Sequence, residues 1–132
     1  MKGMLQKTYD LLYRLGVTSN YKGFFHTAYA VELCRKEPGR LLLVTKWVYP
    51  EVARQYGTSW GAVERNIRTV DHVIWRENRL LLEELAHKPL EQKPRNAQLL
   101  AILAASLEAP LPADGAAGAA IISEAMEEVT GD

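Results

Sequence analysis

The sequence predicts an all-α protein, a compact bundle of about six helices that contains a helix-turn-helix. In segment after segment, apolar residues recur at the spacing of three and four that an amphipathic helix requires. Only the run LLLVTKWVY at 41–49 has the composition of a strand, and the sequence offers no second run to pair with it. The chain has 132 residues, 48% of them apolar, which is enough for one domain with a single core.

The first half of the chain is expected to form three helices. Apolar residues from Leu5 to Leu15 predict a first helix that ends at Gly16. Ser19 or Asn20 can cap a second helix, which runs to about Lys36, before a Pro-Gly pair. Because a lone strand is unstable, the run at 41–49 is interpreted as a short buried helix.

The segment from 49 to 75 predicts the helix-turn-helix. Pro50 suits the first position of a helix, where the missing N–H has no partner to lose. Gly57 can adopt the left-handed conformation that ends a helix, and Thr58 or Ser59 can cap the next one. The turn is therefore short, and a second helix is expected over about 59–76.

The second of these helices has two contrasting faces. At about 100° per residue, four apolar residues form one narrow stripe and are expected to be core: Val63, Ile67, Val70 and Ile74. The opposite face carries Arg65 and Arg68, with Glu64 beside them. Arg can donate two hydrogen bonds to guanine, and Glu can accept one from cytosine, so these three are the candidate base-reading residues for double-stranded DNA. The candidates for contacts to the DNA backbone are Lys22, Lys46, Arg54, Ser59, Thr69 and His72.

The remaining segments complete the bundle. Arg79–Ala86 is expected to be a short helix, 87–94 a loop between two prolines, and Ala97–Leu107 a strongly apolar closing helix. Residues 1–108 are thus predicted to be a helical DNA-binding domain. Residues 109–132 are predicted to be a Pro/Ala/Gly spacer and an acidic tail. One hypothesis is that the acids of this tail fold back on the basic reading face and compete with DNA phosphates.

Charge and composition narrow the function classes. The formal net charge is zero, but residues 1–79 contain 13 Lys and Arg against 7 Asp and Glu, and residues 80–132 contain 3 against 9. A basic half that includes the predicted reading helix fits attraction to phosphates. One cysteine and three scattered histidines give no metal-ligand spacing, and no nucleophile is paired with a base. We therefore expect no enzyme, no cofactor and no metal. No run is long enough to span a membrane and no signal peptide is present, so a cytoplasmic location is expected.

These segments, in their order and in their residues, resemble the C-terminal effector domain of the stage-zero sporulation response regulator family. The resemblance covers roughly Leu11 to Leu107. The matching positions are Leu15-Gly16-Val17, Lys22-Gly23-Phe24, Thr45-Lys46, Tyr49 to Ala53, Val63-Glu64-Arg65, Ile67-Arg68, Trp75, Lys93-Pro94 and Asn96.

The resemblance implies an all-helical domain that binds a short GC-containing box, usually in tandem copies, and contacts the sigma subunit of RNA polymerase. It also implies base reading by Glu64, Arg65 and Arg68 and pairing of two copies on tandem sites. One family arginine is replaced here by Ala62, and the segment before Pro94 is a few residues shorter than in the family. The alternative hypothesis is a helical protein-interaction or dimerisation module, for which exposed tryptophans clustered away from Arg65 would be the sign.

Overall fold

The fold is all-helical over the part of the chain that this computed structural model describes, residues 3–107. The elements are α1 (Met4–Arg14), α2 (Lys22–Lys36), the 3₁₀ helix η1 (Pro38–Leu42), α3 (Val44–Trp47), α4 (Tyr49–Tyr56), α5 (Trp60–Ala86) and α6 (Asn96–Leu107). The predicted fold class is confirmed. The predicted spacer and acidic tail at 109–132 lie outside the described residues.

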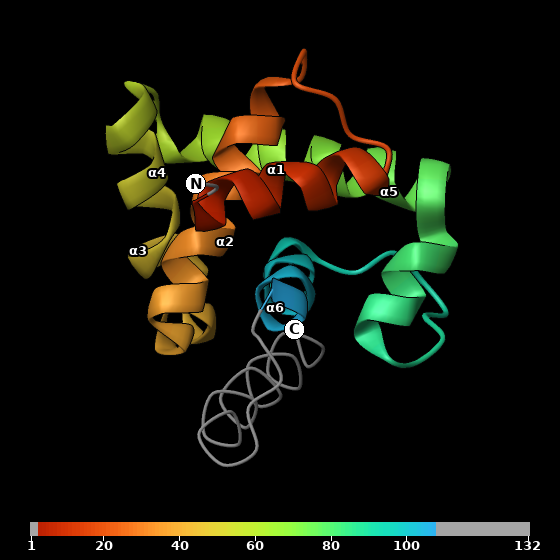
Figure 1. Ribbon diagram of the computed structural model, residues 1–132. Helices are drawn as coiled ribbons and strands as arrows, with labels where there is room; N and C mark the ends of the chain where they lie inside the picture. The colour runs from red at the N-terminus through yellow and green to blue at the C-terminus, as the bar shows by residue number, and fades with distance from the viewer. Residues whose placement is uncertain (1–2, 108–132) are drawn as a thin grey trace.

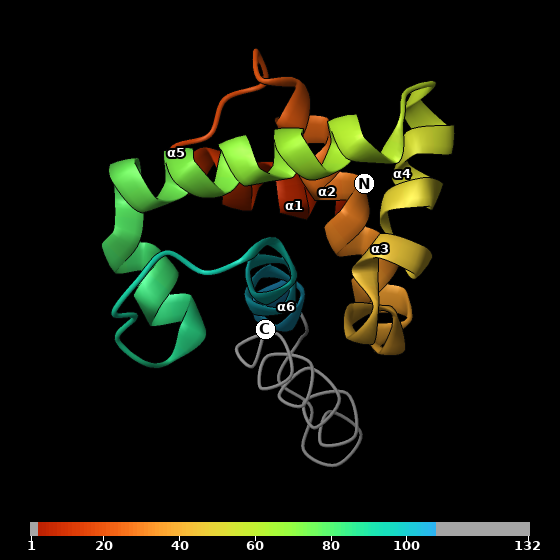
Figure 2. The same ribbon diagram turned by 180° about the vertical axis from the view of Figure 1, so that it is seen from behind.

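Helix α2 is the centre of the bundle and packs against α1, α4, α5 and α6. Figures 1 and 2 show α3 and α4 at one side of the molecule and the second part of α5 at the other. Helix α6 lies between these sides and is apolar over most of its circumference, as its buried run from Leu99 to Ala104 requires. The core thus joins segments from both ends of the described chain.

A close approach between helices fixes how α5 crosses α2. A Cβ atom added to Gly23 of α2 would lie 2.2 Å from the carbonyl oxygen of Asn66 in α5. Only glycine leaves room for backbone at that distance. The position of α5 against the bundle therefore depends on a residue without a side chain.

Three details differ from the sequence predictions. The second helix begins at Lys22 with Tyr21 as its N-cap and no side-chain cap, because Asn20 hydrogen-bonds Thr18 instead. The predicted buried helix at 41–49 is a 3₁₀ turn followed by the four-residue α3, and it is largely exposed. Pro38 occupies the first turn of η1, and the tight turn that follows leaves Leu42 and Leu43 facing outward.

The third difference concerns the two helices predicted at about 59–76 and 79–86, which form one element with a kink. Asn78 has non-helical angles, φ −153° and ψ 57°. Its side-chain amide donates to the carbonyl of Arg14 at 2.9 Å, and its Oδ1 accepts from the N–H of Leu81 at 3.3 Å. Asn78 therefore caps the second part of α5 and ties the kink to the end of α1.

Candidate nucleic-acid interface

The turn between α4 and α5 has the geometry that the sequence predicts. Gly57 is left-handed, with φ 64° and ψ 43°, and ends α4. The N–H of Thr58 donates to the carbonyl of Ala53 at 3.0 Å, and the Oγ of Ser59 accepts from the N–H of Ala62 at 3.2 Å. Ser59 is thus the N-cap of α5, and the turn needs only three residues.

The two faces of α5 separate as expected. Val63, Ile67, Val70 and Ile74 are fully buried. Arg65, Arg68, Thr69 and His72 are exposed, and Glu64 is partly exposed. The first part of α5, which Figure 2 shows at the front of the bundle, therefore presents a polar ridge to solvent.

The charged side chains on this ridge differ in whether they already have a partner in the protein. Within the described residues, the guanidinium of Arg65 has no ion pair or hydrogen bond. Arg68 Nη1 donates to Glu64 Oε1 at 3.1 Å, one helical turn away. Such an exposed pair stabilises a helix by only about 0.5 kcal/mol, so it opens readily for another partner.

Arg65 borders a surface hollow of about 520 Å³ at the junction of three segments. Lys22, from the start of α2, lies on its wall with Thr58 of the turn and with Ala62 and Arg65 of α5. Two cations and a turn between helices thus surround one concave surface. The hollow has the positive charge that attracts a phosphate group.

His26 lies behind this hollow and is buried. Its ring contacts the ring of Tyr56 with centroids 5.2 Å apart, and its Nδ1 lies 3.4 Å from the amide of Asn66. Burial, and then the nearby charge of Lys22, lowers the pKa of His26 below its ordinary value of 6.5. The histidine is therefore neutral at pH 7 and acts as a polar support. Sequence reasoning did not identify these three residues, because their contacts join three different helices.

The predicted backbone-contacting residues are not gathered at one place. Lys22 lines the hollow with Arg65, whereas Lys46, Arg54, Ser59, Thr69 and His72 do not. Arg54 is engaged with Glu51, and the ammonium of Lys46 lies 4.9 Å from the centre of the Trp47 ring. The Thr69 hydroxyl donates to the Arg65 carbonyl at 3.1 Å. Thr69 would have to release this bond before it could donate to a phosphate.

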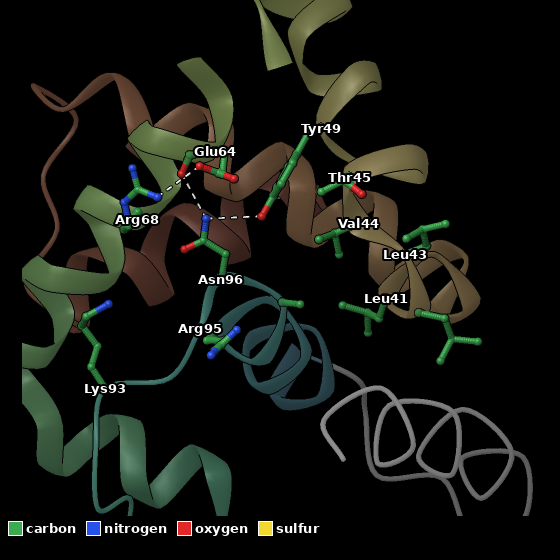
Figure 3. A pocket seen from close by; sticks show the side chains of 12 residues that line it. Leu41, Leu43, Val44, Thr45, Tyr49, Glu64, Arg68, Lys93, Arg95 and Asn96 are labelled. Atoms are coloured by element: carbon green, nitrogen blue, oxygen red, sulfur yellow. Dashed lines mark hydrogen bonds and ion pairs between the residues drawn. The ribbon is translucent and has the colours of Figure 1, made fainter. Parts of the chain in front are cut away.

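Asn96 attaches the start of α6 to the reading helix. Its side-chain amide donates to the backbone carbonyl of Glu64 at 3.0 Å and to the hydroxyl of Tyr49 at 3.3 Å. Figure 3 shows Asn96 between these two residues. Because Tyr49 begins α4 and Glu64 belongs to α5, one amide joins both helices of the helix-turn-helix to α6. This role could not be read from the sequence, where the three residues are far apart.

A buried acid lies on the inner side of α5. Asp71 is fully buried, its Oδ2 lies 3.4 Å from the Nζ of Lys93, and its Oδ1 has no hydrogen-bond partner within residues 3–107. Burial raises the pKa of Asp71 from 3.8 to about 7, and the charge of Lys93 only partly opposes that shift. The pair anchors the segment before α6 to the reading helix. The sequence analysis did not single out Asp71, because its partner Lys93 is 22 positions away.

The tryptophans do not form one cluster. Trp47 in α3 and Trp60 at the start of α5 are about half exposed. Trp75 is partly buried, and the guanidinium of Arg79 lies 4.1 Å from the centre of its ring. Their distribution therefore gives only limited support to a protein interface, at Trp47.

Three further features concern metal binding, cysteine reactivity and membrane spanning within the described residues. No group of three His, Cys, Asp or Glu side chains is placed to hold a metal ion there. Cys34 is buried, and burial raises the pKa of its thiol to about 12, so the nucleophilic thiolate is scarce. Within residues 3–107, none of the helices combines the length and the apolar character needed to cross a bilayer.

One comparison with known proteins identifies a family. The family model described as "Sporulation initiation factor Spo0A C terminal" matches residues 8–107. The match begins within α1 and ends with α6, so it includes the turn, both helices of the helix-turn-helix and the Asn96 anchor.

Proposed function

The chain belongs to the family of the sporulation initiation factor Spo0A C-terminal domain, and on this premise we propose that it is a transcriptional regulator that reads a specific sequence in double-stranded DNA. The family is one of DNA-binding transcription factors and not of enzymes. The observation that supports sequence reading is the state of Arg65. This residue is exposed on α5 and unpaired within residues 3–107, and it lies beside the turn and Lys22.

In the proposed complex the first part of α5, about 59–76, enters the major groove, which is about 12 Å wide. Arg65 donates hydrogen bonds to a guanine. Arg68 donates to a neighbouring guanine, and Glu64 accepts from a cytosine amino group. Glu64 and Arg68 hold each other in the free protein. They can reach the bases at a cost of less than about 1 kcal/mol, because the pair is exposed.

The backbone contacts of this proposal surround the reading helix. Lys22 neutralises a phosphate at the hollow beside Arg65, and Ser59 marks the end of α5 whose free N–H groups favour an anion. Lys46, Arg54, Thr69 and His72 are further candidates, all of them exposed. These contacts set affinity and register, and the contacts of Arg65 set sequence preference.

Two partners are proposed from the resemblance described above: the sigma subunit of RNA polymerase, and a second copy of the chain on tandem sites. A protein-interaction module is the second candidate function. It is favoured by Leu42, Leu43 and Trp47, which are 46–48% exposed on η1, α3 and the residue between them.

The test is a binding assay with the full chain. A preferred duplex is first selected from a random library, and its affinity is then compared with that of a scrambled duplex at two salt concentrations. We expect a preference that persists at the higher salt, because base contacts do not depend on counterion release. A chain that fails to enrich any duplex would contradict sequence reading and favour the interaction module.

Two variants separate the roles. Arg65→Ala should remove about 1–3 kcal/mol of discrimination between the two duplexes. Lys22→Ala should weaken both duplexes alike and lower the salt slope by about one unit. Lys36→Ala is the matched control, because Lys36 is an exposed lysine at the opposite end of the same helix. Equal effects of Lys22→Ala and Lys36→Ala would refute the phosphate contact.

A further inference from the structure

A second concave surface lies on the flank of the reading helix opposite the Lys22 hollow. It is a groove of about 400 Å³ between residues 41–45, the Glu64 and Arg68 turn of α5, and residues 93–97 at the start of α6 (Figure 3). The hollow beside Lys22 shares none of its lining residues.

The two ends of this groove differ in chemistry. Leucines from residues 41–43 lie at one end, and Arg68 and Lys93 lie at the other, with Arg95 between them (Figure 3). Two of the leucines, Leu42 and Leu43, are nearly half exposed. Arg95 is exposed, and its guanidinium has no partner within residues 3–107. The groove therefore suits an occupant that has both apolar side chains and carboxylates.

The sequence beyond α6 has this chemistry. Ile122, Ala125, Met126 and Val129 follow the i, i+3, i+4, i+7 pattern of an apolar helical stripe. Glu124, Glu127 and Glu128 follow the same spacing on the opposite face of such a helix, and Glu128 borders the apolar stripe. This pattern is typical of an acidic amphipathic helix that lays its apolar face into a groove.

Charge favours an occupant from the same chain. Residues 1–107 contain all 16 Lys and Arg against 10 Asp and Glu, whereas residues 108–132 contain six acids and no Lys or Arg. The two parts therefore carry opposite net charges of equal size. Attraction between tethered segments acts at a high effective concentration, so it does not need a tight contact.

The stretch of chain between the end of α6 and residue 121 is long enough for residues 121–132 to reach the groove. Helix α6 starts at the groove with Asn96 and ends at Leu107, a length of roughly 18 Å for its 12 residues. The 13 residues 108–120 can span at most roughly 43 Å when fully extended, which exceeds this length. Residues 121–132 can thus return along α6 to the groove.

We propose that residues 121–132 dock in the groove between residues 41–45, α5 and the start of α6. Their apolar stripe lies on Leu42 and Leu43, the long side chain of Arg95 reaches round the segment toward Glu128, and the net positive charge of residues 1–107 attracts the acidic face as a whole. Glu64 and Arg68 also line the groove. Docking covers part of the reading ridge and competes with DNA, a consequence that rests on the proposed function.

The docking is tested without DNA. A spin label is attached at Ser123→Cys in the full chain, where native Cys34 is buried and unreactive. Paramagnetic broadening of amide signals is expected at Leu42, Leu43 and Arg95. It should disappear in the triple variant Glu124→Gln, Glu127→Gln, Glu128→Gln. No broadening, or broadening centred on Lys22, would overturn the proposal. Spin-labelled chains without isotope are also mixed with isotope-labelled chains without a spin label. Equal broadening in this mixture would mean that a second copy of the chain is the occupant, and it would also overturn the proposal.

Groove variants provide the matched controls. Arg95→Glu and Leu42→Gln should each reduce the broadening. Lys36→Glu and Leu80→Gln make the same chemical changes at exposed positions outside the groove and should leave it unchanged. If all four variants weaken the broadening equally, the attraction is nonspecific and the proposed docking site is refuted.

A DNA experiment then tests the consequence. The triple Glu→Gln variant should bind DNA at least about fivefold more tightly than the unmodified chain at low salt, as expected for a typical coupling between sites. The gain should shrink at high salt, where the charges are screened. Broadening without any DNA binding would leave the docking intact and refute the proposed function. Broadening with DNA binding but no gain would refute the competition.

Discussion

The side-chain amide of Asn96 donates to the backbone carbonyl of Glu64 at 3.0 Å, so the first residue of α6 holds the turn of α5 that carries the candidate base-reading residues. The same amide donates to the hydroxyl of Tyr49 at 3.3 Å. The relative position of α4 and α5 therefore depends on the closing helix as well as on their own turn.

The first prediction concerns this anchor. Asn96→Ala should lower the free energy of unfolding by about 1–3 kcal/mol, because it removes the partner of a part-buried tyrosine hydroxyl. Urea denaturation followed by circular dichroism measures the loss. Gln92→Ala, at an exposed loop position, is the control and should change little. Equal stability of the two variants would show that the anchor contributes nothing.

A second prediction tests the crossing of α2 and α5. Gly23→Ala should destabilise the protein by at least about 3 kcal/mol, since its Cβ would lie 2.2 Å from the Asn66 carbonyl oxygen. Gly61→Ala is the matched control within α5, because nothing lies within 4 Å of its added Cβ. It should stabilise the helix by about 0.5–1 kcal/mol. Thermal unfolding distinguishes the two, and a Gly23→Ala protein that melts like the unmodified chain would contradict the close approach.

A third prediction follows from the buried carboxyl of Asp71. Its pKa is raised from 3.8 to about 7, so between these values the folded protein holds a proton that the unfolded chain has released. Stability therefore falls as the pH rises from about 4 to about 7, and the loss persists at higher pH. Asp71→Asn should remove this fall. The difference in the free energy of unfolding between the Asp71→Asn variant and the unmodified protein should therefore be more favourable to the variant at pH 8 than at pH 5. This change with pH is at most about 4 kcal/mol.

Melting temperatures of both proteins at the two pH values measure this effect. The comparison cancels the contribution of His26, whose lowered pKa reduces stability on the acidic side in both proteins. Lys93 loses its partner in the variant, but its side chain is 26% exposed and can be hydrated. An advantage of Asp71→Asn that does not change with pH would show that the carboxyl stays ionised.

A fourth prediction concerns Ala62, the position where the resembling family has an arginine. Ala62 lines the hollow with Lys22 and Arg65. Ala62→Arg should therefore raise affinity for DNA and steepen the salt dependence by about one unit, because one more phosphate or base edge is contacted by a cation. Binding titrations over a range of salt concentrations measure the slope. Ser19→Arg, an exposed substitution before α2, is the control for added charge alone, and an equal rise from both would refute a specific contact.

Local sequence patterns predicted the turn of the helix-turn-helix and the buried and exposed faces of α5. The 3.6-residue spacing of Val63, Ile67, Val70 and Ile74 identified the buried stripe of α5 and, by exclusion, the exposed ridge with Arg65. Gly57 and Ser59 identified the turn, because the left-handed angle and the N-cap are properties of single residues. The roles of Glu64, Arg65 and Arg68 in DNA binding remain predictions.

By itself the sequence determined the fold class, the helix-turn-helix and the face of α5 that meets solvent, since each depends on residues a few positions apart. Only the tertiary structure decided the kink that Asn78 makes against α1, the anchor of Asn96 on Glu64, and the burial of Asp71 beside Lys93. These contacts join residues from 22 to 64 positions apart. Their partners are chosen by how whole helices pack, and no local spacing encodes that choice.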